Sequence, residues 1–64
     1  MKLTLKALRV NKKMTQKEAA KRLGIALPTL QNYEAGKFWP IVPIIKKMEV
    51  EYGVKFDQIE WREK

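Results

Sequence analysis

Apolar residues recur at intervals of three and four along most of this chain, which is the spacing of an amphipathic α-helix. Short polar or glycine-containing stretches interrupt the pattern and divide it into several short segments. The segments predicted to be helical are residues 1–13, residues 16–23, residues 28–35, residues 41–52 and a short turn at residues 57–59. The pattern therefore predicts an all-α fold, a compact bundle of about five short helices that forms a single domain over residues 1–64.

Residues 15–36 predict two short helices joined by a tight turn. Thr15 is followed three residues later by Glu18, which is the capping-box pattern at the start of a helix. Gly24 is expected to end that helix, because glycine adopts the left-handed backbone conformation without a steric penalty. Ala20 is small enough to let two helices approach each other closely. This arrangement predicts a central helix-turn-helix.

The outward side of the second of these helices carries the residues that are candidates for contacting DNA bases. Gln31 and Asn32 are expected to point away from the core, and amide side chains recognise the major-groove edge of adenine through two hydrogen bonds. Leu27 and Pro28 have no polar side-chain atoms, so they can only contact a thymine methyl group or fill space. Residues 27–34 are therefore the segment that would read DNA bases.

A spaced set of residues extends beyond this unit over nearly the whole chain, in register and without gaps. Its members are Leu8, Arg9, Thr15, Gln16, Ala20, Leu23, Gly24, Ile25, Thr29, Leu30, Tyr33, Glu34, Gly36, Lys37, Pro40, Tyr52, Gly53, Val54, Phe56, Asp57, Gln58 and Ile59. In this set the chain resembles the Cro/repressor type of helix-turn-helix regulators (XRE-like), which includes the small phage repressors. The resemblance implies a lambda-repressor-like fold and a double-stranded DNA operator as the partner.

The resemblance also implies roles for individual side chains. Arg9 is expected to form a structural ion pair with Glu34, with a phosphate contact as the alternative for Arg9. Gln16 is expected to contact a DNA phosphate, because it starts a helix whose free N–H groups and positive dipole end favour an anion. Lys17 and Lys37 are further candidates for phosphate contacts, and Lys37 follows a glycine that brings the backbone close.

The chain departs from the family pattern where the second helix of the unit begins. Relatives usually have serine or threonine where this chain has Ala26, and alanine cannot cap a helix. Pro28 disfavours helical backbone at Leu27 but is favourable at the first helical position, so we expect the helix to begin at Pro28. The departure leaves Gln31 and Asn32 as the polar side chains for direct base readout.

The charge balance favours a polyanionic partner. The chain has 14 Lys and Arg against 7 Asp and Glu, a net charge of +7 and a pI near 9.9. It contains no cysteine for a disulfide or thiolate metal site, and no histidine, the commonest general base and metal ligand. We therefore expect no enzyme activity, cofactor, metal or small-molecule substrate. The longest apolar run, residues 41–45, is too short to cross a membrane, which predicts no membrane partner and a cytoplasmic location.

Apolar side chains are unusually frequent near the C-terminus. Phe56, Ile59 and Trp61 form either a lid on the core or half of a homodimer interface. Phe38 and Trp39, in the loop after the recognition helix, are likewise expected to serve the core or an interface.

The leading interpretation is a sequence-specific regulator of transcription that binds double-stranded DNA, a phage or bacterial repressor that is a homodimer at least on DNA. The alternative is a protein-interaction module of the same fold, such as an antitoxin-like partner-binding domain. The loop aromatics and the apolar pair Leu27 and Pro28 favour this alternative. An enzyme is the least favoured interpretation.

Overall fold

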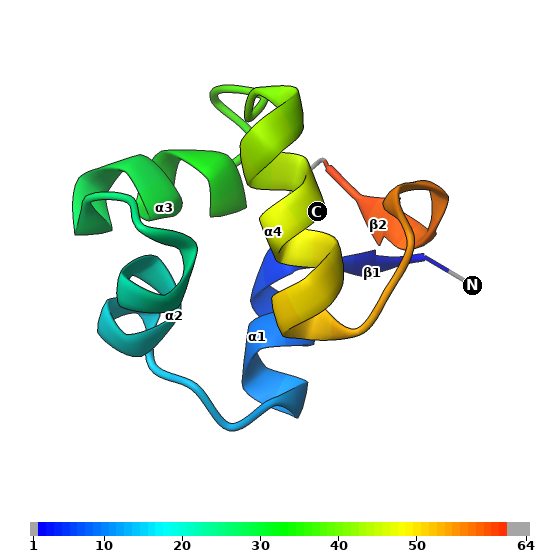
Figure 1. Cartoon of the computed structure of the whole chain (residues 1–64), viewed down its shortest axis with the longest axis horizontal. Coiled ribbons are helices and arrows are strands. Elements are labelled where there is room, and N and C mark those ends of the chain that lie inside the picture. The colour runs from blue at the N-terminus through cyan, green and yellow to red at the C-terminus, as the bar shows by residue number, and fades with distance from the viewer. Residues whose placement is uncertain (1, 62–64) are drawn as a thin grey trace.

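The computed structural model describes residues 2–61 and arranges them as helices around one core (Figure 1). The elements in chain order are β1 (Leu3–Thr4), α1 (Leu5–Asn11), α2 (Gln16–Leu23), α3 (Leu27–Glu34), α4 (Val42–Tyr52), the 3₁₀ helix η1 (Phe56–Gln58) and β2 (Ile59–Glu60). Helices α2 and α3 lie at one end of the molecule, and the two strands lie at the other (Figure 1). The helical class is therefore confirmed. The predicted number of about five helices is slightly off, because the described residues form four α-helices, the single 3₁₀ turn η1 and a small sheet.

The first helix is shorter than the predicted segment of residues 1–13, because its start is fixed by a cap. Thr4 has extended backbone, and its hydroxyl oxygen accepts a hydrogen bond from the backbone N–H of Ala7 at 3.1 Å. This bond satisfies one of the N–H groups that a helix leaves unpaired at its first turn. The helix therefore begins at Leu5, and the residues before it are available for strand pairing.

The expected fifth helix is a single 3₁₀ turn, and a short strand follows it. The predicted turn at residues 57–59 is the short 3₁₀ helix η1, and the chain then extends into β2. Strand β2 pairs with β1 in parallel, with Leu3 opposite Ile59. The helical periodicity does not reveal this pairing, because it joins the two ends of the chain.

The central helix-turn-helix prediction is confirmed at α2. The backbone N–H of Thr15 donates to the Glu18 carboxylate at 3.0 Å, and the backbone N–H of Glu18 donates to the Thr15 hydroxyl at 3.1 Å. Gly24 ends the helix in the left-handed conformation with φ of 71°. Ala20 is buried in the core, and α2 packs against both α3 and α4.

Helix α3 begins at Leu27, one residue earlier than predicted. Ala26 takes the extended backbone of an N-cap and makes no side-chain capping bond, as expected for alanine. Pro28 is then the second helical residue, where its missing N–H costs no helical hydrogen bond. The restriction that proline places on its predecessor is therefore overridden at Leu27.

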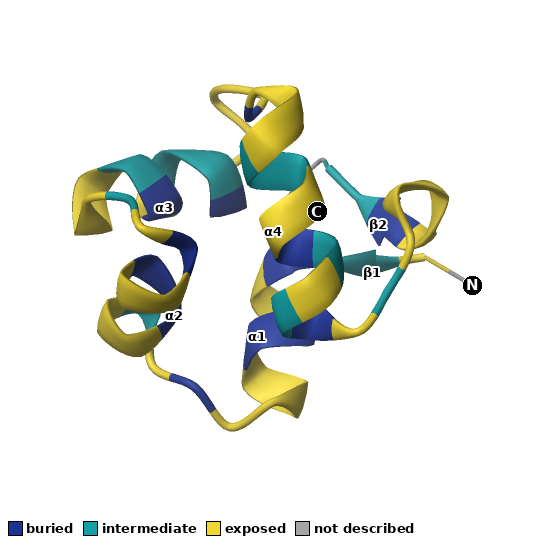
Figure 2. Ribbon diagram, viewed as in Figure 1, coloured by how far each residue is buried: buried dark blue, intermediate teal, exposed yellow. Residues whose placement is uncertain are grey.

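The core lies where the four helices and β2 face one another (Figure 2). Two apolar residues that fit the helical spacing lie outside the core. Ile41 is 66% exposed because it is the extended N-cap residue before α4, and Val10 on α1 is 55% exposed. No helix within residues 2–61 is long and apolar enough to cross a membrane. The buried apolar residues are Leu5, Leu8, Met14, Ala19, Ala20, Leu23, Leu30, Met48, Tyr52 and Ile59.

We expect Ala26→Ser to raise the free energy of unfolding by about 1 kcal/mol. A serine hydroxyl at this N-cap can accept a backbone N–H of the first turn of α3. Urea unfolding followed by circular dichroism measures the change. Thr15→Ala is the matched control and should lower stability by a similar amount, because it removes a cap that is present. A lower stability of Ala26→Ser would contradict this description of α3.

Candidate nucleic-acid interface

Helix α3 turns one side toward the core and the other toward solvent. Glu34 lies on the inner side and is 9% exposed. The residues predicted to read bases lie on the solvent-facing side of the helix, which we call the outer face of α3: Leu27, Pro28 and Gln31 are exposed, and Asn32 is half-buried at its edge. The structure thus places all four on one accessible surface of a single helix.

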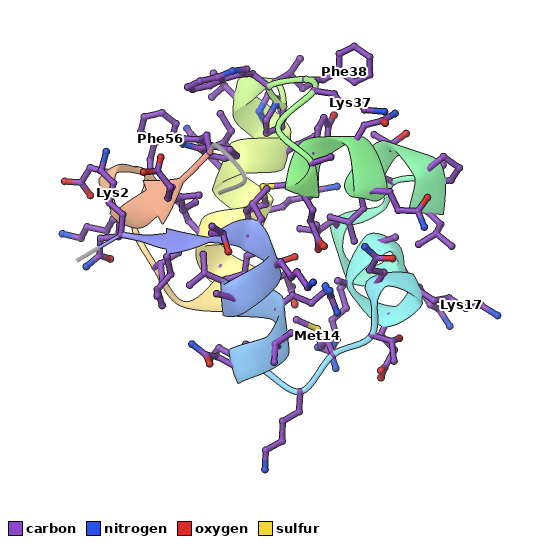
Figure 3. All side chains as sticks on the ribbon, turned by 180° about the vertical axis from the view of Figure 1, so that it is seen from behind. Lys2, Met14, Lys17, Lys37, Phe38 and Phe56 are labelled. Carbon is purple, nitrogen blue, oxygen red and sulfur yellow. The ribbon has the colours of Figure 1, made fainter. Side chains whose placement is uncertain are left out.

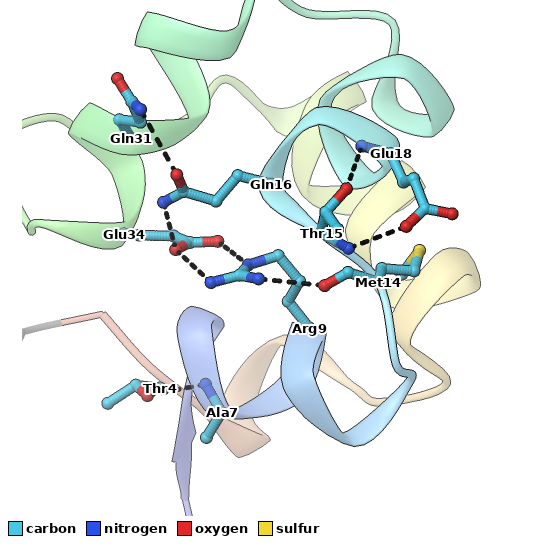
Figure 4. A network of polar contacts seen from close by, with 9 residues as sticks. All are labelled: Thr4, Ala7, Arg9, Met14, Thr15, Gln16, Glu18, Gln31 and Glu34. Carbon is cyan, nitrogen blue, oxygen red and sulfur yellow. Dashed lines mark hydrogen bonds and ion pairs between the residues drawn. The ribbon is translucent and has the colours of Figure 1, made fainter.

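A buried ion pair connects α3 to α1 (Figure 4). The Nε atom of Arg9 donates to Glu34 Oε2 at 2.8 Å, and Nη2 donates to Oε1 at 3.3 Å. The Nη1 atom of Arg9 donates to the backbone carbonyl of Met14 at 3.0 Å. The side chains of Arg9 and Glu34 are 10% and 6% exposed, respectively. The pair therefore joins α1, α3 and the segment before α2, which fits a structural role for Arg9.

Tyr52 on α4 is packed near the same pair. Burial, reinforced by the negative charge of Glu34, raises the pKa of Tyr52 to about 12. The hydroxyl is buried and has no hydrogen-bond partner within residues 2–61. Tyr52 is therefore neutral at physiological pH and adds no further charge beside Arg9 and Glu34.

Gln16 occupies the first position of α2, but its side chain is not free. Its Nε2 atom donates to Glu34 Oε1 at 3.1 Å, and its Oε1 atom accepts from Gln31 Nε2 at 3.3 Å (Figure 4). The second N–H of the Gln16 amide makes no hydrogen bond within residues 2–61. Sequence reasoning missed both bonds, because the partners are 18 and 15 residues away along the chain.

Two lysines expected to contact phosphates flank the outer face of α3. Lys17 near the start of α2 and Lys37 after α3 are exposed, and both project outward from the half of the molecule built from these helices (Figure 3). Arg22, also on α2, is 3.6 Å from Glu51 on α4 in an exposed ion pair. Arg22 can readily leave Glu51 for another partner, because exposed ion pairs contribute little to the free energy of folding.

An aromatic cluster lies away from the outer face of α3. The ring centroid of Trp61 is 5.7 Å from that of Trp39 and 5.6 Å from that of Phe56. Trp39 is still 64% exposed and Phe56 43% exposed. Ile59 is 1% exposed, so its assignment to a dimer interface is corrected: Ile59 belongs to the core. Phe56 and Trp61 remain as candidates for an interface.

A shallow apolar groove runs beside this cluster on the outer side of α4. Glu49 accepts the backbone N–H of Phe56 at 2.7 Å and thereby holds η1 against the helix. The groove is lined by Val42, Ile45, Lys46, Glu49 and Phe56. This surface offers apolar contacts, whereas the outer face of α3 offers amides flanked by lysines.

A family profile described as helix-turn-helix matches residues 5–59, which contain α1 to α4 and the start of β2. The chain belongs to the Cro/repressor (XRE-like) helix-turn-helix family. It is 36% identical over 59 residues to an uncharacterised HTH-type transcriptional regulator of Methanocaldococcus jannaschii. That match covers 92% of this chain and 89% of the relative. No solved structure matches this helix-turn-helix protein significantly.

We expect Arg9→Ala to lower the free energy of unfolding of this helix-turn-helix protein by about 3–5 kcal/mol. The substitution leaves the Glu34 carboxylate buried without its charged partner. Urea unfolding measures the loss. The matched control is Arg22→Ala, whose exposed pair with Glu51 should contribute at most about 1 kcal/mol. An Arg9→Ala variant with wild-type stability and no DNA binding would instead make Arg9 a phosphate contact.

Proposed function

We propose that this helix-turn-helix protein binds double-stranded DNA sequence-specifically and regulates transcription as a repressor that occupies an operator. The observation that carries the proposal is the outer face of α3, an accessible helix surface whose amides are flanked by Lys17 and Lys37. The match to a relative named as a transcriptional regulator supports the same function.

The outer face of α3 suits the major groove of B-DNA, which is wide enough for one α-helix. Asn32 and Gln31 supply the donor and acceptor pairs that match the edge of adenine. Leu27 and Pro28 supply apolar contacts that fit a thymine methyl group. Residues 27–34 thus read bases mainly at A·T pairs in this proposal.

In this proposal, contacts to DNA phosphates hold α3 in the major groove. Lys17 lies at the start of α2, where the positive end of the helix dipole adds to its charge, and Lys37 lies beyond the end of α3. The remaining N–H of Gln16 can join them. A net charge of +7 favours the release of DNA counterions on binding.

Two copies on one operator would compensate for the few polar groups on each outer face. One bidentate amide contact contributes about 1–3 kcal/mol of discrimination, so a single copy would have modest selectivity. Half-sites of a dimer lie about 34 Å apart. The longest dimension of the protein is 27 Å, which is compatible with two copies side by side at that spacing. Phe56 and Trp61 are the proposed contacts of this homodimer.

The second candidate function is a protein-interaction module, such as an antitoxin-like partner-binding domain. The groove on α4 and the loop residues Phe38 and Trp39, 58% and 64% exposed, favour it. A partner protein would cover these apolar surfaces and leave the outer face of α3 unused. Variants of Lys37 and Asn32 would then have no effect on binding, which separates this function from the first.

Binding to DNA should depend steeply on salt. If a dimer neutralises about 6 phosphates, the logarithm of affinity falls with the logarithm of salt concentration at a slope of about −5. Lys37→Ala should lower affinity for all sequences and reduce this slope. Fluorescence anisotropy on a labelled duplex measures both quantities. Lys55→Ala, near the strands at the other end of the molecule, is the matched control and should change neither. A salt-independent complex would contradict the proposal.

Asn32→Ala should relax the base preference at one position of each half-site and leave non-specific affinity nearly unchanged. The reason is that a base-reading amide contributes to discrimination, whereas lysines contribute to general affinity. Selection of bound sites from a random DNA pool measures the preference, and ultracentrifugation of the complex measures its stoichiometry. An unchanged preferred site would remove Asn32 from the reading residues, and one protein copy per site would rule out the dimer.

A further inference from the structure

The side of α4 that faces away from the core combines apolar residues with one charge of each sign. The residues at intervals of three and four along the helix share this side, which we call the outer face of α4. Its apolar members are well exposed, since Val42 is 61% and Val50 79% exposed. The outer face of α4 consists of Val42, Ile45, Lys46, Glu49 and Val50.

The two charges on this face have no charged partner in the described part of the chain. Lys46 is exposed, and no ion pair joins it to Glu49 or to another acid within residues 2–61. Glu49 is half-buried, and its Oε2 atom accepts the backbone N–H of Phe56 at 2.7 Å. The other carboxylate oxygen of Glu49 therefore remains available to a cation from outside the chain.

A lysine and a glutamate three residues apart on one helix complement a second copy of the same helix. In a two-fold contact, if residue i of one copy meets residue j of the other, residue j of the first copy meets residue i of the second. Two copies of α4 packed antiparallel, with the axis level with the midpoint of residues 47 and 48, bring Lys46 of each copy to Glu49 of the other. One antiparallel contact thus forms two identical ion pairs.

We propose that the outer face of α4 is a self-association surface, on which two copies pack antiparallel and exchange ion pairs between Lys46 and Glu49. The proposal deepens the proposed homodimer, and it rests on the proposed function for the use of this dimer on an operator. Phe56 lines the groove at the edge of the outer face of α4, so the surface adjoins a contact already proposed for the homodimer.

The charge of the face favours a second copy over a nucleic acid. The chain carries a net charge of +7, but Lys46 and Glu49 cancel on the outer face of α4. A phosphate backbone would therefore meet repulsion and attraction in equal measure there. A second copy supplies the opposite charge at each position, and the valines exposed around the charges gain apolar contact.

Sedimentation velocity of the free protein over a concentration series tests the proposal without DNA. Lys46→Glu and Glu49→Lys should each weaken dimerisation by about 10- to 100-fold, because each converts attraction into repulsion at two symmetric contacts. The double exchange should restore dimerisation, because it inverts both pairs. Glu49→Lys and the double exchange both lose the bond to Phe56, so comparing these two variants isolates the charge effect.

Two further variants separate this effect from folding and from net charge. Glu49→Gln keeps an oxygen for the Phe56 N–H and should weaken dimerisation less than Lys46→Glu does. Lys21→Glu makes the same change in net charge as Lys46→Glu on the exposed side of α2, and it should leave dimerisation unchanged. Circular dichroism confirms that each variant is folded.

Two results would overturn the proposal. One is a wild type that stays monomeric throughout the series, which would leave the outer face of α4 to a different protein. The other is dimerisation that is unaffected by Lys46→Glu, or a folded double exchange that dimerises no better than Glu49→Lys. A charge-dependent dimer that binds no duplex would support this surface and overturn the DNA-binding function alone.

Discussion

The buried ion pair of Arg9 and Glu34 is the interaction on which the rest of the structure depends. It joins α1 to α3 through two hydrogen bonds and reaches the segment before α2 through the Met14 carbonyl. A domain of this size buries a modest share of its surface, so apolar packing alone leaves a small margin of stability. Burying the two charges costs desolvation free energy. Loss of either partner would leave an uncompensated buried charge and strongly destabilise the fold. Its value lies in fixing the position of α3 relative to the rest of the molecule.

Two chemically different surfaces lie at different places on the fold. The outer face of α3 carries amides with lysines on either side, which suits a nucleic acid. The groove on α4 and the cluster of Trp39, Phe56 and Trp61 carry apolar side chains, which suit a protein surface. A DNA-bound homodimer would use both surfaces at once, whereas a protein-interaction module would use the second alone.

Local sequence signals predicted the parts of this structure that depend on neighbours in the chain. The capping box at Thr15 and the left-handed Gly24 are set by residues within one helical turn, and both were found as expected. The pairing of β1 with β2 was missed, because it joins residues more than 50 positions apart. Of the two roles that the sequence left open for Ile59, its burial supports the one in the core. Leu27, Pro28 and Gln31 of α3 are exposed and Asn32 is half-buried, and their part in reading bases stays a prediction. The hydrogen bonds of Gln16 and Gln31 were not predictable, because the spacing of apolar residues along the chain says nothing about contacts between side chains of different helices.

The most direct test of the central claim is an NMR titration of the ¹⁵N-labelled protein with a selected operator duplex at low salt. Chemical-shift changes identify the surface that contacts the partner without altering any residue. The account predicts the largest changes at the outer face of α3 and at the start of α2, including Gln31, Asn32 and Lys17. Changes confined to the groove on α4, or no changes on addition of duplex, would contradict it.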